Sequence, residues 1–183
     1  MEQEKQKTGE ELAAKIMEYA RDELMISMRF LDRALFRMPL VAADSVAAFG
    51  VDGATMYYNP EYVLHAFKRE KNACTRAFLH MILHCIFSHP FQYEKLDREC
   101  WDLATDLAVE QSILDLNLKC VELERDVSLK RTLSHLAQKV PILTAEKIYR
   151  WLYENPEESA EFFREEPQFM WDDHLKWIPL KEN

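Results

Sequence analysis

The sequence is poor in glycine: three of its 183 residues are glycine, at positions 9, 50 and 53. Soluble proteins contain about 7% glycine on average. Phosphate-cradling loops and dinucleotide-binding turns need several closely spaced glycines, and neither pattern occurs here. We therefore exclude the Gly-rich classes of nucleotide-binding protein. A chain with little glycine and many Leu, Ala, Glu and Met residues is typical of a mostly helical fold.

Basic residues are also in the minority. Lys and Arg number 23 against 32 for Asp and Glu, which gives a formal net charge of −9 at pH 7. The chain has no dense basic run, the feature with which many proteins bind nucleic acid or anionic membrane surfaces. We expect neither nucleic acid nor a membrane as a partner.

Paired cysteines and long apolar segments are absent as well. The four cysteines form no Cys-x-x-Cys pair, and residues 1–11 lack the apolar core of a signal peptide. We expect reduced cysteines and a cytoplasmic protein. Residues 77–93 carry no Asp, Glu, Lys or Arg, but they are fewer than the ~20 apolar residues of a membrane span. This stretch predicts a buried helix.

Periodicity divides the chain into helices around one β element. Apolar residues recur at helical spacing over residues 10–38. A turn sequence containing Gly53 separates two strand-like runs and predicts a β-hairpin over residues 46–58. Asn59 and Pro60 are suited to cap and to begin the next helix. Further helices are predicted over residues 60–69, 72–89, 97–116 and 144–153.

These patterns predict an α+β fold that is predominantly α, with one small β-hairpin or sheet. We expect a flexible N-terminus over residues 1–9, a globular domain over 10–154, and an acidic and aromatic C-terminal segment over 155–183. Within that segment, the proline-bounded residues 155–167 are predicted to be solvated. The aromatic residues 169–177 are predicted to dock back on the domain.

Three of the six histidines, His80, His84 and His89, lie within ten residues. His80 and His84 are four residues apart, so they lie one turn apart on one face of a helix, separated by about 40°. Two imidazoles in this arrangement can share one zinc ion. The predicted helix is apolar nearly all round, so both side chains need buried partners, and a metal would satisfy both. The alternative is that each histidine bonds a carbonyl or carboxylate and no metal is bound.

Further residues can complete or support this site. His89 lies about 140° round from His84, so it can be a ligand only if the helix ends or bends before Pro90. A supporting or helix-end role for His89 is the alternative. Asp102 and Asp106 lie on an apolar stripe of the next predicted helix. We predict Asp106 as the third ligand and Asp102 as a residue that orients an imidazole, unless Asp102 only stabilises the start of its helix.

An ordered series of motifs extends from the predicted hairpin to the C-terminal segment. It consists of Asp52-Gly53, Tyr57-Tyr58-Asn59-Pro60, His80 with His84 and His89, Trp101 with Ala104 and Asp106, and Asp172-Asp173-His174. The series resembles a bacterial metallopeptidase domain that precedes a von Willebrand factor A-like domain in longer proteins. The resemblance implies a zincin-like fold with the hairpin beside the metal helix, and zinc or another divalent metal held by His80, His84 and Asp106. It also implies a MoxR-type AAA+ ATPase as a protein partner.

Two features depart from the family pattern. The glutamate of the His-Glu-x-x-His motif, which takes a proton from metal-bound water in such hydrolases, is Met81 here. A thioether cannot accept that proton, and loss of a positioned base lowers rates by about 10²–10⁴. Glu110 and Asp102 are the candidates to replace it. The second departure is that an A-like domain is absent, so we expect a truncated chain or a stand-alone relative.

Three functions remain open at this point. The first is a zinc-binding, catalytically impaired domain (a pseudoenzyme) that acts as a structural or partner-binding module. The second is an active zinc-dependent hydrolase with a displaced general base. The third is a metal-free helical interaction domain whose histidines are satisfied core residues. Asp172, Asp173 and His174 either cap the metal from the far end of the chain or belong to a docking tail.

Overall fold

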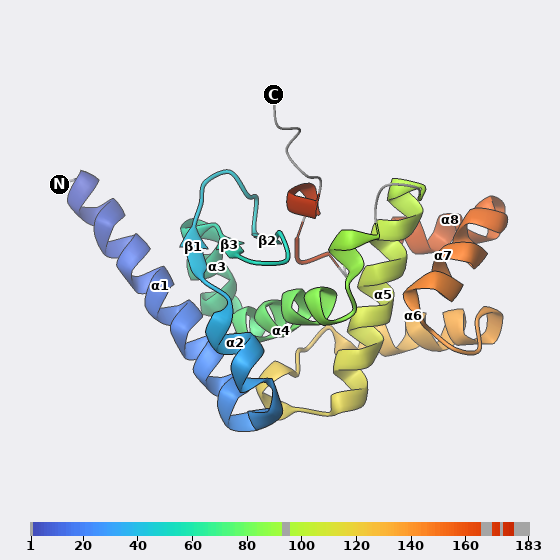
Figure 1. Cartoon of the computed structure of the whole chain (residues 1–183), viewed down its shortest axis with the longest axis horizontal. Coiled ribbons are helices and arrows are strands. Elements are labelled where there is room, and N and C mark those ends of the chain that lie inside the picture. The colour runs from blue at the N-terminus through green and yellow to red at the C-terminus, as the bar shows by residue number, and fades with distance from the viewer. Residues whose placement is uncertain (1, 93–95, 166–169, 173, 178–183) are drawn as a thin grey trace.

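Figure 1 shows the computed structural model, which describes every residue except 1, 93–95, 166–169, 173 and 178–183. The described residues form eight α-helices and a three-stranded sheet, which confirms the predicted α+β, predominantly α class. The helices are α1 (Glu2–Ser27), α2 (Asp32–Arg37), α3 (Pro60–Arg69), α4 (Ala73–Ile86), α5 (Arg98–Leu116), α6 (Asp126–Lys139), α7 (Ala145–Glu154) and α8 (Pro156–Glu165). The strands are β1 (Leu40–Ala42), β2 (Phe49–Val51) and β3 (Met56–Tyr58).

The first predicted helix is broken into two. α1 begins at Glu2 and ends at Ser27, and a 3-10 turn over Arg29–Leu31 separates it from α2. Met28 interrupts the helix with φ −135° and ψ 62°, which lie outside the helical region. The break turns the chain back from the end of α1 toward β1, while α1 packs along α3 and α4 (Figure 1).

The predicted hairpin is present and is part of a slightly larger sheet. β2 and β3 pair antiparallel, and Asp52 Oδ1 closes the turn by accepting hydrogen bonds from the backbone N–H groups of Ala54 and Thr55. β1, which the sequence did not predict, pairs parallel with β3. The strand order is therefore β1-β3-β2, and β2 is an edge strand.

The helices that carry the candidate residues begin largely as predicted. Asn59 Oδ1 caps α3 by accepting from two backbone N–H groups, and Asp97 Oδ1 caps α5 by accepting from that of Cys100. α4 ends at Ile86, three residues before its predicted end, because Ser88 adopts a left-handed conformation with φ 62°. Among the described helices, none combines the length and the apolar character that crossing a membrane requires.

The C-terminal third contains two helices that the sequence did not predict, α6 and α8. Residues 155–167 were expected to be solvated, yet Pro156–Glu165 form α8 and bury Phe162. Most of these residues are exposed, as expected, but the prediction missed the helix, because its acidic surface accompanies a short apolar face that packing stabilises. Residues 170–172 and 174–177, hereafter the closing segment, dock back on the domain as expected, with Trp171 and Trp177 buried.

Two apolar cores meet along α5. The first core unites α1, α3, α4 and the sheet, and the second unites α5 to α8. α5 contributes Val109 and Ile113 to the first core and Leu103 and Leu107 to the second. α4 packs against α5 at this boundary, and the closing segment lies between β2 and α5 (Figure 1). The polar residues described next lie at this junction.

Candidate metal centre

Four buried side chains from three parts of the chain converge between α4, α5 and the closing segment. They are His80 and His84 of α4, Asp106 of α5 and Asp172 of the closing segment, and one donor atom of each lies within 4.8 Å of the others. The Nε2 atoms of His80 and His84 are 2.8 Å apart, and Asp106 Oδ1 lies 3.2 and 3.3 Å from them. We call these four residues the donor cluster.

The donor cluster fits a divalent metal ion. A tetrahedral site with bonds of about 2.0–2.1 Å has its donor atoms about 3.3 Å apart. The distances from Asp106 Oδ1 to the two Nε2 atoms match this separation, and the two Nε2 atoms, 2.8 Å apart, lie closer than that. Both carboxylate oxygens of Asp172 are buried and make no hydrogen bond within the described part of the chain, although Oδ1 lies 2.8 Å from His174 Nε2. A buried carboxylate without a hydrogen bond is costly, and a metal cation would stabilise it. Two imidazoles and two carboxylates suit zinc and related transition metals.

Glu110 holds His80 in the tautomer that a ligand needs. Glu110 Oε1 lies 2.8 Å from His80 Nδ1, and a carboxylate only accepts, so Nδ1 carries the proton and the Nε2 lone pair faces the donor cluster. Glu110 is itself fixed by Arg76 Nη2 at 2.6 Å and by Trp171 Nε1 at 3.0 Å. Glu110, offered by the sequence as a substitute base, therefore lies behind a histidine with both oxygens in use.

Burial and neighbouring charges shift the pKa values of the residues in the donor cluster. Burial by itself lowers the pKa of His80, but the carboxylates of Asp106 and Glu110 outweigh it and raise that pKa to about 9. Burial, reinforced by the charge of His80, lowers the pKa of His84 to about 4. Burial would raise the pKa of Asp106, but the nearby imidazoles, above all His174, hold it well below its usual value. In metal-free protein, protonated imidazoles thus balance the carboxylates.

His174 lies at the edge of the donor cluster. The sequence pattern alone left open whether this residue belongs to the site or to a docking tail. Its Nε2 atom is 2.8 Å from Asp172 Oδ1 and 3.2 Å from Asp106 Oδ1, and its Nδ1 is 3.2 Å from Asp102 Oδ1. Burial would lower the pKa of His174, but Asp172 and Asp106 raise it well above its usual value. Asp102 thus faces an imidazole of the closing segment. Asp173 lies outside the described residues.

His89 lies beside the donor cluster and not in it. The left-handed turn at Ser88 directs His89 back toward α4, where its Nδ1 lies 3.1 Å from His84 Nδ1. His84 therefore faces His89 with one ring nitrogen and the donor cluster with the other. Burial, with the charge of His84, lowers the pKa of His89 to about 3, so its ring is neutral at physiological pH. This geometry corresponds to the supporting role that the sequence left open for His89.

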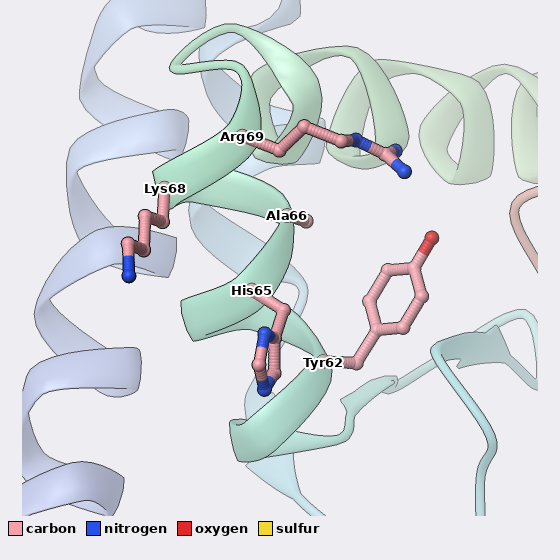
Figure 2. Close-up of a pocket in the computed structure, with 5 residues that line it drawn as sticks. All are labelled: Tyr62, His65, Ala66, Lys68 and Arg69. Carbon is pink, nitrogen blue, oxygen red and sulfur yellow. The ribbon is translucent and has the colours of Figure 1, made fainter.

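A surface hollow along α3 lies apart from this centre. Figure 2 shows Tyr62 and Arg69 extending from the same side of α3, with Lys68 extending toward α1; His65 and Ala66 complete the lining. The His65 side chain is 78% exposed and lies 4.0 Å from the carboxylate of Glu61. In the described ranges, the only group of side chains able to hold a metal ion is the donor cluster, so the chemistry of the domain is concentrated there.

Comparison with protein-family models matches residues 14–169 to the family described as "Putative metallopeptidase domain". Comparisons with curated proteins and with solved structures give no significant match. The matched range includes α4 and α5 and hence His80, His84 and Asp106, whereas Asp172 lies beyond it. The family match agrees with the metallopeptidase resemblance of the motif series. The chain therefore belongs to this metallopeptidase-domain family.

Proposed function

We propose that this domain binds one divalent metal ion, zinc by the preference of its donors, and acts as a structural or partner-binding module without peptidase activity. The observation that carries the proposal is the convergence of four buried donors from three parts of the chain. A metal ion at this point joins α4, α5 and the closing segment. Because the unfolded chain has no such site, metal binding stabilises the folded state.

The number of protein donors supports a structural metal site. Catalytic zinc sites have three protein ligands and keep one position for water or substrate, whereas structural sites have four. Here His80, His84 and Asp106 correspond to the three, and Asp172 supplies a fourth. All four side chains are buried, which supports a closed site over one that is open to the water that hydrolysis needs.

Among the described residues, neither candidate carboxylate is placed as a general base, which supports impaired catalysis. Met81 follows the first histidine in the place of the family glutamate, and it is fully buried in the first core. Both oxygens of Glu110 already accept hydrogen bonds, and Asp102 faces His174. Neither carboxylate is placed to replace the base, and the expected loss in rate is about 10²–10⁴.

Elemental analysis and a peptidase assay test both parts of the proposal. Protein purified without chelator should contain about one zinc ion per chain, the His84→Ala variant should contain none, and neither should cleave a broad peptide library. Folded wild-type protein without metal would contradict the metal site. Chelator-sensitive cleavage that Glu110→Gln or Asp102→Asn abolishes would instead support an active hydrolase with a displaced base.

The partner-binding role extends the proposal to a MoxR-type AAA+ ATPase, by family analogy. Exposed apolar side chains at the turn between α1 and α2, Ile26, Phe30 and Phe36, offer a contact surface. Co-elution with such an ATPase in size-exclusion chromatography tests this role. The Phe30→Ser variant should lose co-elution and keep its zinc; failure of the wild-type protein to co-elute would contradict the assignment.

A further inference from the structure

The closing segment docks on the free edge of the sheet. Asp172 forms a parallel β-bridge with Phe49 of β2. At the next residue, Gly50, a Cβ atom would lie 3.2 Å from Val46 Cγ1 and 3.3 Å from Lys176 Cγ, so the absence of a side chain allows the segment to approach closely. The Lys176 ammonium group lies 4.8 Å above the ring of Tyr57. The glycine in the edge strand thus favours close docking of the segment that carries Asp172.

Two tryptophans fix the closing segment to the two cores. Trp171 belongs to the first core, and the guanidinium of Arg125 lies 4.1 Å above its ring. Trp177 belongs to the second core and stacks on His174, with ring centroids 3.9 Å apart and an interplanar angle of 28°. The Trp177 ring also lies 4.9 Å from that of His84. Trp177 therefore covers the donor cluster from the side of the closing segment.

Side-chain contacts hold this segment in place, with little regular secondary structure to support it. Besides the single β-bridge, the described residues of the closing segment contain one 3-10 turn, Leu175–Trp177. A hydrogen bond from Trp177 N–H to His174 C=O closes this turn. His174 has φ 51°, a left-handed conformation that L side chains rarely adopt. Few backbone hydrogen bonds therefore oppose separation of the segment from the sheet, and the burial of Trp171 and Trp177 is the main contribution that holds it docked.

We propose that the closing segment is a latch on the metal centre. When it is docked, Asp172 fills the fourth coordination position and Trp177 covers His84. When it separates, a water molecule replaces Asp172 as a ligand and the centre is exposed to competing ligands. Gly50 and Trp177 are positioning residues, since they place Asp172 without supplying a donor atom. The metal-gating part of this inference rests on the proposed function, whereas the docking itself does not.

Zinc transfer to a colorimetric chelator tests the latch in the full chain. Zinc-loaded Trp177→Ala protein should release zinc at least about tenfold faster than wild type, the lower end of the effect of removing residues that support a metal ligand. The matched control is Trp151→Ala, which removes a partly buried tryptophan of α7 that packs on Phe162, in the second core. The control should release zinc at nearly the wild-type rate. Equal release from wild type and Trp177→Ala, or equal acceleration in both variants, would overturn the proposal.

Cobalt substitution and hydrogen exchange separate the latch from general stability. With Co²⁺ in place of zinc, Trp177→Ala and Gly50→Ala should both shift the visible spectrum toward that of Asp172→Asn, because each change removes Asp172 from the metal. An unshifted spectrum in both would overturn the latch. If the chain binds no metal, the proposed function fails, and hydrogen exchange of the Trp177 amide, which donates to His174 C=O and belongs to a buried residue, decides the docking. Protection that Gly50→Ala removes would support docking, and an unprotected Trp177 amide in wild type would exclude it.

Discussion

The metal centre takes His80, His84 and Asp106 from two long helices and Asp172 from the closing segment, and the chain holds these two halves very differently. On the helical side, Glu110 fixes His80, and Arg76 in turn fixes Glu110, both almost fully buried. On the other side, one β-bridge, the burial of Trp171 and Trp177, the Trp171–Glu110 hydrogen bond and the contacts of His174 hold the segment. Regular helices hold the first half, whereas side-chain contacts hold the closing half.

This difference suggests that the helical half and the closing segment control different properties of the proposed metal site. If the proposed site binds a metal, the histidine pair, preoriented by a buried carboxylate, should determine whether the metal binds and how tightly. The closing segment, held by few backbone hydrogen bonds, should determine how easily the metal exchanges and whether an open coordination position arises. Variants of the helical half should therefore change affinity and folding, and variants of the closing half should change access.

Removing a helical ligand should have the largest effect. The His80→Ala variant should lose the bound metal completely, because it removes one donor and leaves the carboxylates of Asp106 and Glu110 without their imidazole partner. Elemental analysis and the change in Tm on zinc addition measure this loss. His65→Ala, which removes an exposed histidine, is the control and should bind zinc as wild type does. A zinc-dependent rise in Tm in His80→Ala would show that the helical half does not determine binding.

Breaking the ion pair behind His80 should destabilise the fold itself. Arg76 and Glu110 are buried, with Nη2 and Oε2 2.6 Å apart. Arg76→Met leaves the Glu110 carboxylate without its cation, a change that typically costs about 3–5 kcal/mol. Urea unfolding measures the change, and Arg131→Met, at an exposed position of α6, is the matched control. A loss below about 1 kcal/mol, the usual value of a surface pair, would mean that this half is less rigid than its contacts indicate.

The metal-free protein should lose stability as the pH rises from about 6.5 to about 9. The folded-state pKa of His80 is raised from 6.5 to about 9, so its contribution is fully present below pH 6.5 and is lost as the pH passes through 9. His174, also raised, changes in the same direction. The loss should amount to a few kcal/mol, since each unit corresponds to about 1.4 kcal/mol.

Zinc should abolish most of this pH dependence, because the metal replaces the proton on His80. Urea unfolding at a series of pH values, with and without zinc, measures both curves. Metal-free stability that is flat between pH 6.5 and 9 would contradict the charge balance inferred for the donor cluster.

Removing the carboxylates behind the two imidazoles should have the smallest effect and should separate the two halves directly. Glu110→Gln should weaken zinc binding by about 10–100-fold, the usual effect of losing a group that orients a metal ligand. Asp102→Asn should weaken it less, because Asp102 is partly exposed and faces His174, outside the donor cluster. Competition titration against a chelator of known affinity measures the zinc affinity of both variants. A larger loss of affinity in Asp102→Asn than in Glu110→Gln would contradict the inference that the helical half determines zinc affinity.

Several elements followed from local sequence patterns. The hairpin followed from its turn residues, and α3 followed from the Asn59-Pro60 start. α8 did not, because its apolar face is short and becomes evident only through packing on α7. α6 was missed although Leu129, Leu133 and Leu136 recur at helical spacing and are buried. The strand β1 is three residues long and pairs with a strand that lies fourteen or more positions away, so no local pattern marked it.

The sequence by itself determined that His80 and His84 share one face of a buried helix, because a spacing of four residues fixes their direction wherever that helix lies. It also determined that Met81 follows the first histidine, at the position of the glutamate in the His-Glu-x-x-His motif that the series resembles. Only the tertiary structure decided that Asp172 joins the cluster, that Glu110 lies behind His80, and that Gly50 receives the closing segment. The physical reason is separation along the chain: these contacts join residues whose proximity depends on how the two cores pack.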